Sequence, residues 1–216
     1  MDDLLQQYEA VLLAKGIDVE YALGPGARVE VVQAALAEAG YLVPPALLAL
    51  YTWRNGTNTQ NKTEFLTWFA TLDSGNQQAV WPDQTKEPAA FAYRATPFFP
   101  ETGAFMPLHD ATFAYREAQQ EDFWPANFWP IFHDDSLLLD INPASNTYGQ
   151  VHLQSYSLLI MEPEPYYDSL ESMFTTYLEA LRSGLVPFES ELEPGFSQYR
   201  ELAAQLNPLS AASWCS

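Results

Sequence analysis

Residues 128–162 constrain the fold most strongly, because they divide into short apolar runs separated by turn-forming residues. The stretch reads FWPIFHDDSLLLDINPASNTYGQVHLQSYSLLIME. Asp134-Asp135 and Asn142-Pro143 interrupt the apolar runs, and Gly149 precedes the third of them. Each run has the length of a β-strand, and connections this short join antiparallel neighbours. The stretch therefore predicts an antiparallel meander.

Apolar residues recur at helical spacing on both sides of this meander, which predicts helices there. Asn61 with Glu64, and Asp168 with Glu171, have the spacing of capping boxes at two of the helix starts. Glycines follow several of the segments, as they commonly follow helices. The expected helices cover residues 4–12 with a stop at Gly16, 31–39 with a stop at Gly40, 61–72, 109–120, 168–181 with a stop at Gly184, and 196–206.

One further helix, over residues 45–54, has a sharp boundary at each end. Pro45 suits the first helical turn, where a backbone N–H is not needed, and Asn55-Gly56 suits the left-handed residues that close a helix. Trp53, just before this stop, is expected at a surface rim. Gly56 is expected to need a left-handed backbone, in which other residues are strained.

Charge restricts the class of partner. The 216 residues contain 9 Lys+Arg and 28 Asp+Glu, a formal net charge of −19, and residues 121–216 hold 2 of the basic and 14 of the acidic residues. Direct binding of nucleic acid requires a basic footprint and is not expected. The acidic excess has two interpretations: a solubilising surface, or a field that steers a basic partner.

The sequence also predicts the compartment. It holds no run of about 18 apolar residues, the length that a membrane-spanning helix needs. Met1-Asp2-Asp3 lacks the cationic start of a signal peptide, so we expect a cytoplasmic protein with no membrane contact. We also expect the protein to be a monomer. Cys215 is the one cysteine, which excludes an intrachain disulfide and a cysteine-based zinc site.

One sequence feature, the HDD sequence at residues 133–135, suggests a catalytic site. The histidines are His109, His133 and His152, and His133 precedes Asp134-Asp135 in an order that invites comparison with metal-dependent hydrolases. Such a site needs several ligands that converge on one ion. Neither a Gly-x-Ser-x-Gly elbow nor a Gly-rich phosphate loop is present. We therefore interpret the HDD sequence as a solvated acidic turn, and expect no metal, no cofactor and no enzymatic activity.

The aromatic residues Trp124, Phe128 and Trp129 lie beside Pro125 and Pro130. They could line a ligand groove or fill a core. We favour the core, because large aromatic side chains dominate core packing in mixed domains.

The order of these features resembles a known superfamily. A proline-started helix ending in Asn-Gly is followed by a helix with REAQQ, by WPIFHDD leading to LLLDINP, by a glycine before QVHLQSYS, and by the helix SLESMFTTYLEALRSG. In this order the pieces resemble the SUKH superfamily, and most closely its fungal cell-wall-assembly regulators and bacterial immunity proteins. The resemblance covers residues 28–184.

The resemblance implies an α+β fold, in which helices pack on a twisted, mainly antiparallel sheet. We therefore expect a SUKH-like domain over residues 1–184. The chain departs from the family in residues 73–100 and in its tail, where we expect a C-terminal extension over residues 185–216 with an extra amphipathic helix. The motif positions of the family fall on Asn55 and Gly56 at the helix end, Asp134 and Asp135 at the acidic turn, Asp140 as the strand acid, and Gly149 as the turn glycine.

Many bacterial members of this superfamily bind and neutralise a cognate toxin, often a nuclease. The resemblance therefore implies a non-catalytic cytosolic immunity protein whose partner is a basic toxin domain. Two alternatives stay open: a scaffold or regulator of cell-wall or signalling assembly, and a metal-dependent hydrolase. The residues expected to contact a partner are Trp53, Asn55, Asp134, Asp135, Asp140, Glu162 and Glu164, and those expected to shape the fold are Pro45, Gly56 and Gly149.

Overall fold

Four strands between residues 128 and 167 form an antiparallel meander, one strand more than the three runs that the sequence predicts, because the third run divides into two paired strands. The computed structural model describes residues 1–15, 19, 23–57, 104–121, 123–132, 136–155, 159–185 and 194–214. Within these ranges, the strands lie side by side in chain order. Trp129 lies opposite Leu139, and Leu138 opposite His152. The strands are β3 (Phe128–Pro130), β4 (Ser136–Asp140), β5 (Val151–Ser155) and β6 (Ile160–Tyr167).

The central strands of this sheet are buried on both faces. Leu137 and Leu139 of β4 belong to the main hydrophobic core, whereas Leu138 faces the other way and is also fully buried. All five side chains of β5 are buried. Because both faces are covered, the run of leucines in β4 does not need to alternate with polar residues. The sequence reads as continuous apolar runs for this reason.

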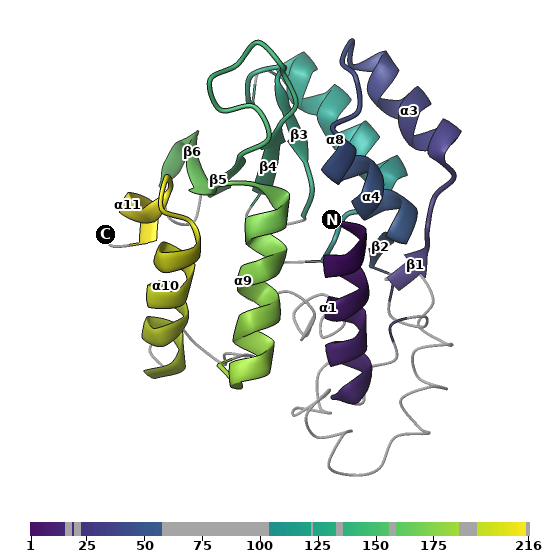
Figure 1. The fold of residues 1–216 in the computed structure, drawn as a ribbon. Helices are drawn as coiled ribbons and strands as arrows, with labels where there is room; N and C mark the ends of the chain where they lie inside the picture. Colours follow the sequence, from purple (N-terminus) through teal and green to yellow (C-terminus); the bar gives the residue numbers. More distant parts are fainter. Residues whose placement is uncertain are drawn as a thin grey trace, which may run out of the picture.

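Helices surround the sheet, which confirms the predicted α+β fold. Figure 1 shows α1, α9 and α10 side by side, with α3, α4 and α8 in a second group. The helices are α1 (Asp2–Ala14), α3 (Val29–Glu38), α4 (Pro45–Trp53), α8 (Leu108–Glu121), α9 (Leu170–Ser183), α10 (Pro194–Leu206) and α11 (Ala211–Trp214). The sequence predicts all of these except α11. The helix expected over residues 61–72, and the stop at Gly16, fall outside the described residues.

Helix α4 begins as predicted and ends differently. Pro45 occupies the first turn, and the helix stops at Trp53. The next residue, Arg54, is extended with φ −145° and ψ 143°, and it starts strand β2 (Arg54–Thr57), which pairs with β1 (Leu23–Pro25). Asn55-Gly56 therefore lies within a strand, and the prediction that it closes the helix is wrong. Pairing with a strand 30 residues earlier overrides the local signal.

Gly56 nevertheless has the left-handed backbone that the sequence predicts, with φ +82°. A second constraint acts at the same position. A Cβ atom on Gly56 would lie 2.4 Å from the backbone nitrogen of Pro107, which enters α8. Glycine is required here both for its backbone conformation and for the close approach of a second segment.

Helix α9 has a capping box, but not the predicted one. The side chain of Ser169 accepts the N–H of Ser172, and the Ser172 hydroxyl accepts the N–H of Ser169. The prediction of a box between Asp168 and Glu171 is therefore wrong. Gly184 ends the helix in the left-handed conformation, as expected, with φ +70°.

The carboxylate of Asp168 instead holds the C-terminal segment. It accepts the N–H of Leu209 at 3.1 Å and both the N–H and the hydroxyl of Ser210 at 2.9 Å. Beyond Gly184, Tyr199, Ala203 and Trp214 join the same hydrophobic core as the helices before it. The C-terminal segment is thus packed into the fold.

A candidate partner-binding surface on strand β6

Strand β6 forms an outer edge of the four-stranded sheet among the described residues. Glu162 and Glu164, two of the predicted contact residues, are both exposed on it. No described residue donates a hydrogen bond to either carboxylate or forms an ion pair with it. Two carboxylates two residues apart, with no partner among the described residues, give this edge a local negative charge.

Prolines and irregular pairing make the addition of a further strand to the same edge unfavourable. Pro163 and Pro165 lack the N–H that a further strand would need, and proline in a sheet is confined to such edges. The pairing with β5 is also irregular: Leu153 lies opposite Glu164, but Ser155 lies opposite Ile160. Bulges of this kind twist an edge away from regular pairing. A partner at this edge must therefore bind through side chains more than by strand addition.

Helix α11 covers the C-terminal half of β6. The Ser213 hydroxyl donates to the carbonyl of Pro165 at 2.6 Å, and the Trp214 indole donates to the carbonyl of Tyr166 at 2.7 Å. The rings of Tyr166 and Trp214 lie 4.0 Å apart between centroids. Within the part of the chain that the structure describes, these contacts leave the N-terminal half of the strand as the accessible part of the edge.

Large apolar side chains lie exposed on β6 and on neighbouring segments. Met161 of β6 is 57% exposed, Leu159 just before the strand is 81% exposed, and Phe123 is 51% exposed. The side-chain amide of Gln154 donates to the carbonyl of Met161 at 2.7 Å and to that of Phe123 at 3.2 Å. Residues 123 and 161 are therefore close neighbours, although 38 positions separate them in the sequence.

Trp53 is half-buried among other side chains and is not at a free rim. Its ring packs edge-on against Tyr8 and Phe174, at centroid distances of 6.3 and 6.2 Å. Its indole N–H donates to Glu9 at 2.6 Å, and the same carboxylate pairs with Arg54 at 2.8 Å. The half-buried Trp53 thus links α4 to α1 and α9.

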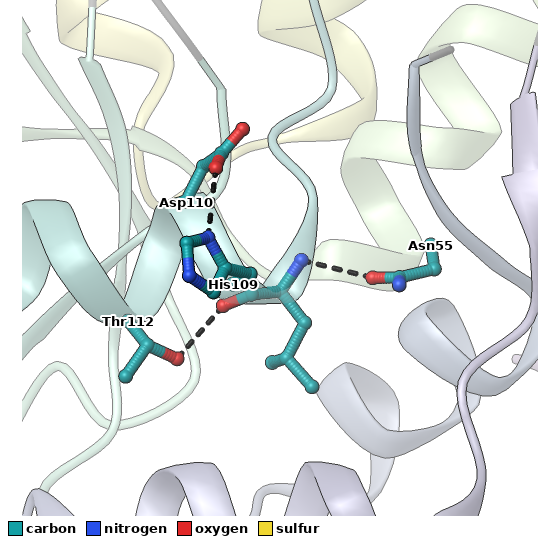
Figure 2. Close-up of polar contacts among 5 residues, drawn as sticks. Asn55, His109, Asp110 and Thr112 are labelled. Atoms are coloured by element: carbon teal, nitrogen blue, oxygen red, sulfur yellow. Dashed lines mark hydrogen bonds and ion pairs between the residues drawn. The ribbon is translucent and has the colours of Figure 1, made fainter. Parts of the chain in front are cut away.

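Asn55 serves the start of helix α8. Its side-chain oxygen accepts the backbone N–H of Leu108 at 2.9 Å, which satisfies one of the N–H groups that a helix start leaves free. Figure 2 shows this contact beside His109 and Asp110. The His109 ring is exposed and lies 3.2 Å from the Asp110 carboxylate. Asn55 therefore has a role within the fold.

Asp140 is buried at the end of β4 and organises the following turn. Its carboxylate accepts the N–H of Asn142 at 3.0 Å and the hydroxyl of Thr147 at 2.7 Å. Burial acts to raise the pKa of Asp140, but hydrogen bonds from Ser145, Thr147, Asn127 and Asn142 outweigh it and lower the pKa. Because Asp140 has no exposed surface, we do not include it in the candidate surface.

The same turn contains Gly149, which has φ +82° with open space where a Cβ atom would stand. Asp134 and Asp135, together with His133, fall outside the described residues. The strand that follows them begins at Ser136, which pairs with Gln154. Their expected role at an acidic turn stays a prediction.

The aromatic residues that could line a ligand groove pack within the fold. Trp129 is fully buried and stacks on Tyr115 at 5.3 Å, and Phe128 packs against His152, which confirms the core interpretation for both aromatic residues. Trp124 is partly exposed and donates to the carbonyl of Phe128. Among the described residues, no group of three or more His, Cys, Asp or Glu could hold a metal ion.

A pocket of about 280 Å³ lies between the starts of α4 and α9. Pro44, Tyr148, Asp168 and Glu171 are among its lining residues. The Asp168 carboxylate is already occupied by Leu209 and Ser210, as described above. The pocket therefore offers less free polar chemistry than the β6 edge.

The sequence thus predicts Glu162 and Glu164 of the candidate surface but not Phe123, Leu159 and Met161. A signal was present in the alternation of glutamate and proline after Met161, which is typical of an edge strand. No described helix combines the length and the apolarity needed to cross a membrane. The chain matches no family model, and no curated protein shows significant sequence similarity to it.

Proposed function

We propose that this protein is a non-catalytic immunity protein, which binds a basic toxin domain and blocks it by occlusion. The observation that carries the proposal is the pair of exposed carboxylates of Glu162 and Glu164 on β6, which have no partner within the ranges that the structure describes. The net charge of −19 and the resemblance to the SUKH superfamily support it further.

The electrostatic argument concerns the rate of association. Exposed charges at a surface steer an oppositely charged partner and raise the association rate by about 10- to 1000-fold. Carboxylates that are already paired within the chain contribute less to such a field. Arg116 and Arg182, for example, pair with Glu38 and Glu179 on helices α3 and α9. Glu162 and Glu164 have no such partner among the described residues, so their charge is available to a basic partner.

The experiment starts from the neighbouring reading frame in the genome. If it encodes a large secreted protein with a variable C-terminal toxin domain, that domain is the probe. Co-expression of this chain is expected to restore growth of cells that produce the toxin domain, and the two purified proteins are expected to bind. The Glu162→Gln/Glu164→Gln variant is expected to associate about tenfold more slowly.

The matched control is Glu30→Gln/Glu117→Gln, which removes the same charge from exposed positions on α3 and α8. This control is expected to associate at close to the wild-type rate. Absence of both binding and protection overturns the proposal. Binding without protection favours the scaffold or regulator instead, and a tightly bound divalent metal in the purified protein favours the hydrolase.

A further inference from the structure

We infer that the pocket between the starts of α4 and α9 receives one arginine side chain of the basic partner. This inference deepens the proposed function, on which it rests, by naming a binding site and the residue that enters it. We call this cavity the α4–α9 pocket. It combines apolar walls, one aromatic ring and two carboxylates among its lining residues.

The size of the pocket limits its occupant. Pockets for small-molecule ligands commonly span about 300–1,000 Å³, and this cavity measures about 280 Å³. Its lining comes from three separate parts of the chain: the start of α4, the turn before β5, and the residues that lead into α9. A cavity of this size suits one protruding side chain of a partner better than a whole cofactor.

The walls suit a long side chain with a planar cationic end. Pro44, Pro45 and Leu139 are apolar lining residues, against which an aliphatic stem can pack. Tyr148 also lines the pocket, and it is 41% exposed. A cation above a tyrosine ring is attracted by the negative face of the ring. The pocket thus offers one surface for the stem and another for the charged group.

The turn that carries Tyr148 is organised before a partner arrives. Thr147 donates its hydroxyl to the buried carboxylate of Asp140 at 2.7 Å, and Gly149 donates its N–H to the carbonyl of Asp140 at 2.8 Å. Asp140 therefore holds the residues on both sides of Tyr148. A site that is organised in advance loses less entropy when its partner binds.

The charge of the pocket belongs to its own lining residues. Glu171 lines the pocket and is exposed, and no described residue forms a hydrogen bond or ion pair with its carboxylate. Asp168 brings a second carboxylate, although its oxygens already accept from Leu209 and Ser210. The free carboxylate of Glu171 is therefore the better partner for an incoming cation.

Two helix starts oppose this charge but do not reverse it. Ala46 and Ser169, at the starts of α4 and α9, both line the pocket. The start of a helix is equivalent to about half a positive charge, so two starts offset about one of the two carboxylate charges. The remaining charge is negative, and it favours a cationic occupant over an anionic one.

The cation that fits best is the guanidinium group of arginine. It is more weakly hydrated than the ammonium group of lysine, it stacks on aromatic rings, and its N–H groups match the two oxygens of a carboxylate. Arginine is also enriched among the residues that dominate the binding energy of protein interfaces. We therefore expect its stem to lie against the prolines and its guanidinium group to reach Tyr148 and Glu171.

The test uses capped tripeptides with a central arginine, citrulline or glutamate. Citrulline has nearly the shape of arginine but carries no charge. The full chain carries ¹⁵N-labelled glycine, which gives signals from its 10 glycines. The signal of Gly149, a lining residue, is assigned with Gly149→Ala. It is expected to shift with the arginine peptide only, and the signal of Gly184, at the far end of α9, is expected to stay in place.

Variants test the two groups that are expected to hold the guanidinium. Glu171→Gln is expected to weaken binding of the arginine peptide by about threefold to fivefold, as loss of one exposed ion pair does. Glu117→Gln removes the same charge from an exposed position on α8 and is expected to leave the affinity unchanged. Tyr148→Leu is expected to weaken binding, whereas Tyr148→Phe keeps the aromatic ring and is expected to bind as the wild type does.

The outcomes separate this inference from the proposed function. If the toxin domain binds the Tyr148→Leu/Glu171→Gln variant with wild-type affinity, the pocket assignment is wrong while the proposed function stands. If the Gly149 signal responds to the arginine peptide only, but no toxin domain binds, the pocket stands and the proposed function is wrong. An unshifted Gly149 signal with the arginine peptide, or an equal or larger shift with the citrulline or glutamate peptide, overturns the inference.

Discussion

The indole of Trp53 donates a 2.6 Å hydrogen bond to the carboxylate of Glu9, and this contact joins α4 to the first helix of the chain. Glu9 also pairs with Arg54, whose side chain is only 14% exposed. One carboxylate thus satisfies two donors that are largely shielded from water.

We expect Glu9→Ala to lower the free energy of unfolding by about 1–3 kcal/mol, because both donors lose their partner where water reaches them poorly. Glu38→Ala is the matched control. Its partner Arg116 is 56% exposed, so we expect a loss of about 0–1 kcal/mol. Urea denaturation measures both, and equal losses would contradict the structural role of Glu9.

Gly56 and Gly149 provide a second matched pair, because both have φ +82°. We expect Gly149→Ala to cost about 1–2 kcal/mol, the strain of a left-handed backbone. Gly56→Ala should cost clearly more, since its Cβ would also collide with Pro107. Gly56→Val adds β-branching and should cost at least as much as Gly56→Ala. Denaturant melts of the two alanine variants measure this difference. Similar midpoints would mean that the close approach of Pro107 adds no cost at position 56.

His152 gives the stability a dependence on pH. Burial lowers the pKa of its ring, and the carbonyl of Pro163 and the charge of Asp140 counteract this in part. In the unfolded chain the pKa is about 6.5, so below that pH the unfolded chain binds a proton that the folded chain excludes. Above about pH 6.5, His152 therefore does not reduce the free energy of unfolding. As the pH falls from there toward the folded-state pKa, the free energy of unfolding decreases.

Between pH 7.5 and 5.5, we expect the free energy of unfolding to fall less in the His152→Gln variant than in the wild type. The difference between the two losses is at most about 1.4 kcal/mol per pH unit. Urea melts at both pH values measure the difference. The carboxylates titrate in both proteins and cancel in the comparison. An identical loss in the two proteins would mean that His152 is protonated equally in the folded and unfolded chains.

Asp168 should govern the C-terminal segment and not helix α9. Asp168→Ala removes the acceptor of the N–H groups of Leu209 and Ser210, and we expect a loss of about 2–3 kcal/mol. Hydrogen exchange should accelerate in α11 and leave α9 protected. Glu171→Ala, an exposed position in the first turn of α9, is the control. Faster exchange confined to α9 would restore the capping role that the sequence predicts.

Local signals made much of the fold predictable. Pro45 at a helix start and Gly184 at a helix end act through their own backbone, so their effect can be read without knowledge of distant contacts. The meander was predictable for the same reason, since short turns alone bring its strands together. The two helix boundaries appear where the sequence predicts them, whereas the third predicted run of the meander divides into β5 and β6.

Long-range contacts account for the errors. Asp168 has the spacing of a capping residue, but Ser210 lies far along the chain and takes its carboxylate. Asn55-Gly56 has the composition of a helix end, but pairing with Leu23–Pro25 draws it into a strand. The sequence contains no signal of either partner, because each contact depends on where the whole fold places a second segment.

The candidate site was predictable only in its charges. Glu162 and Glu164 stand out by composition, and charged residues are rarely buried. Leu159 and Met161 read as part of an apolar strand, and strand periodicity cannot tell a central strand from an outer one. Their exposure follows from the position of β6 at the edge of the sheet.

Helix α1 packs against α9, which comes near the other end of the described chain. During synthesis, α1 leaves the ribosome long before Leu170–Ser183 exists. At 5–20 residues per second, its apolar face waits about 10–30 seconds for that partner. Leu5, Tyr8 and Leu12, all buried in the finished protein, lack their contacts with α9 during this interval, although α4, whose Trp53 packs on Tyr8, is made much earlier. The packing of α1 is therefore completed only after translation has passed α9.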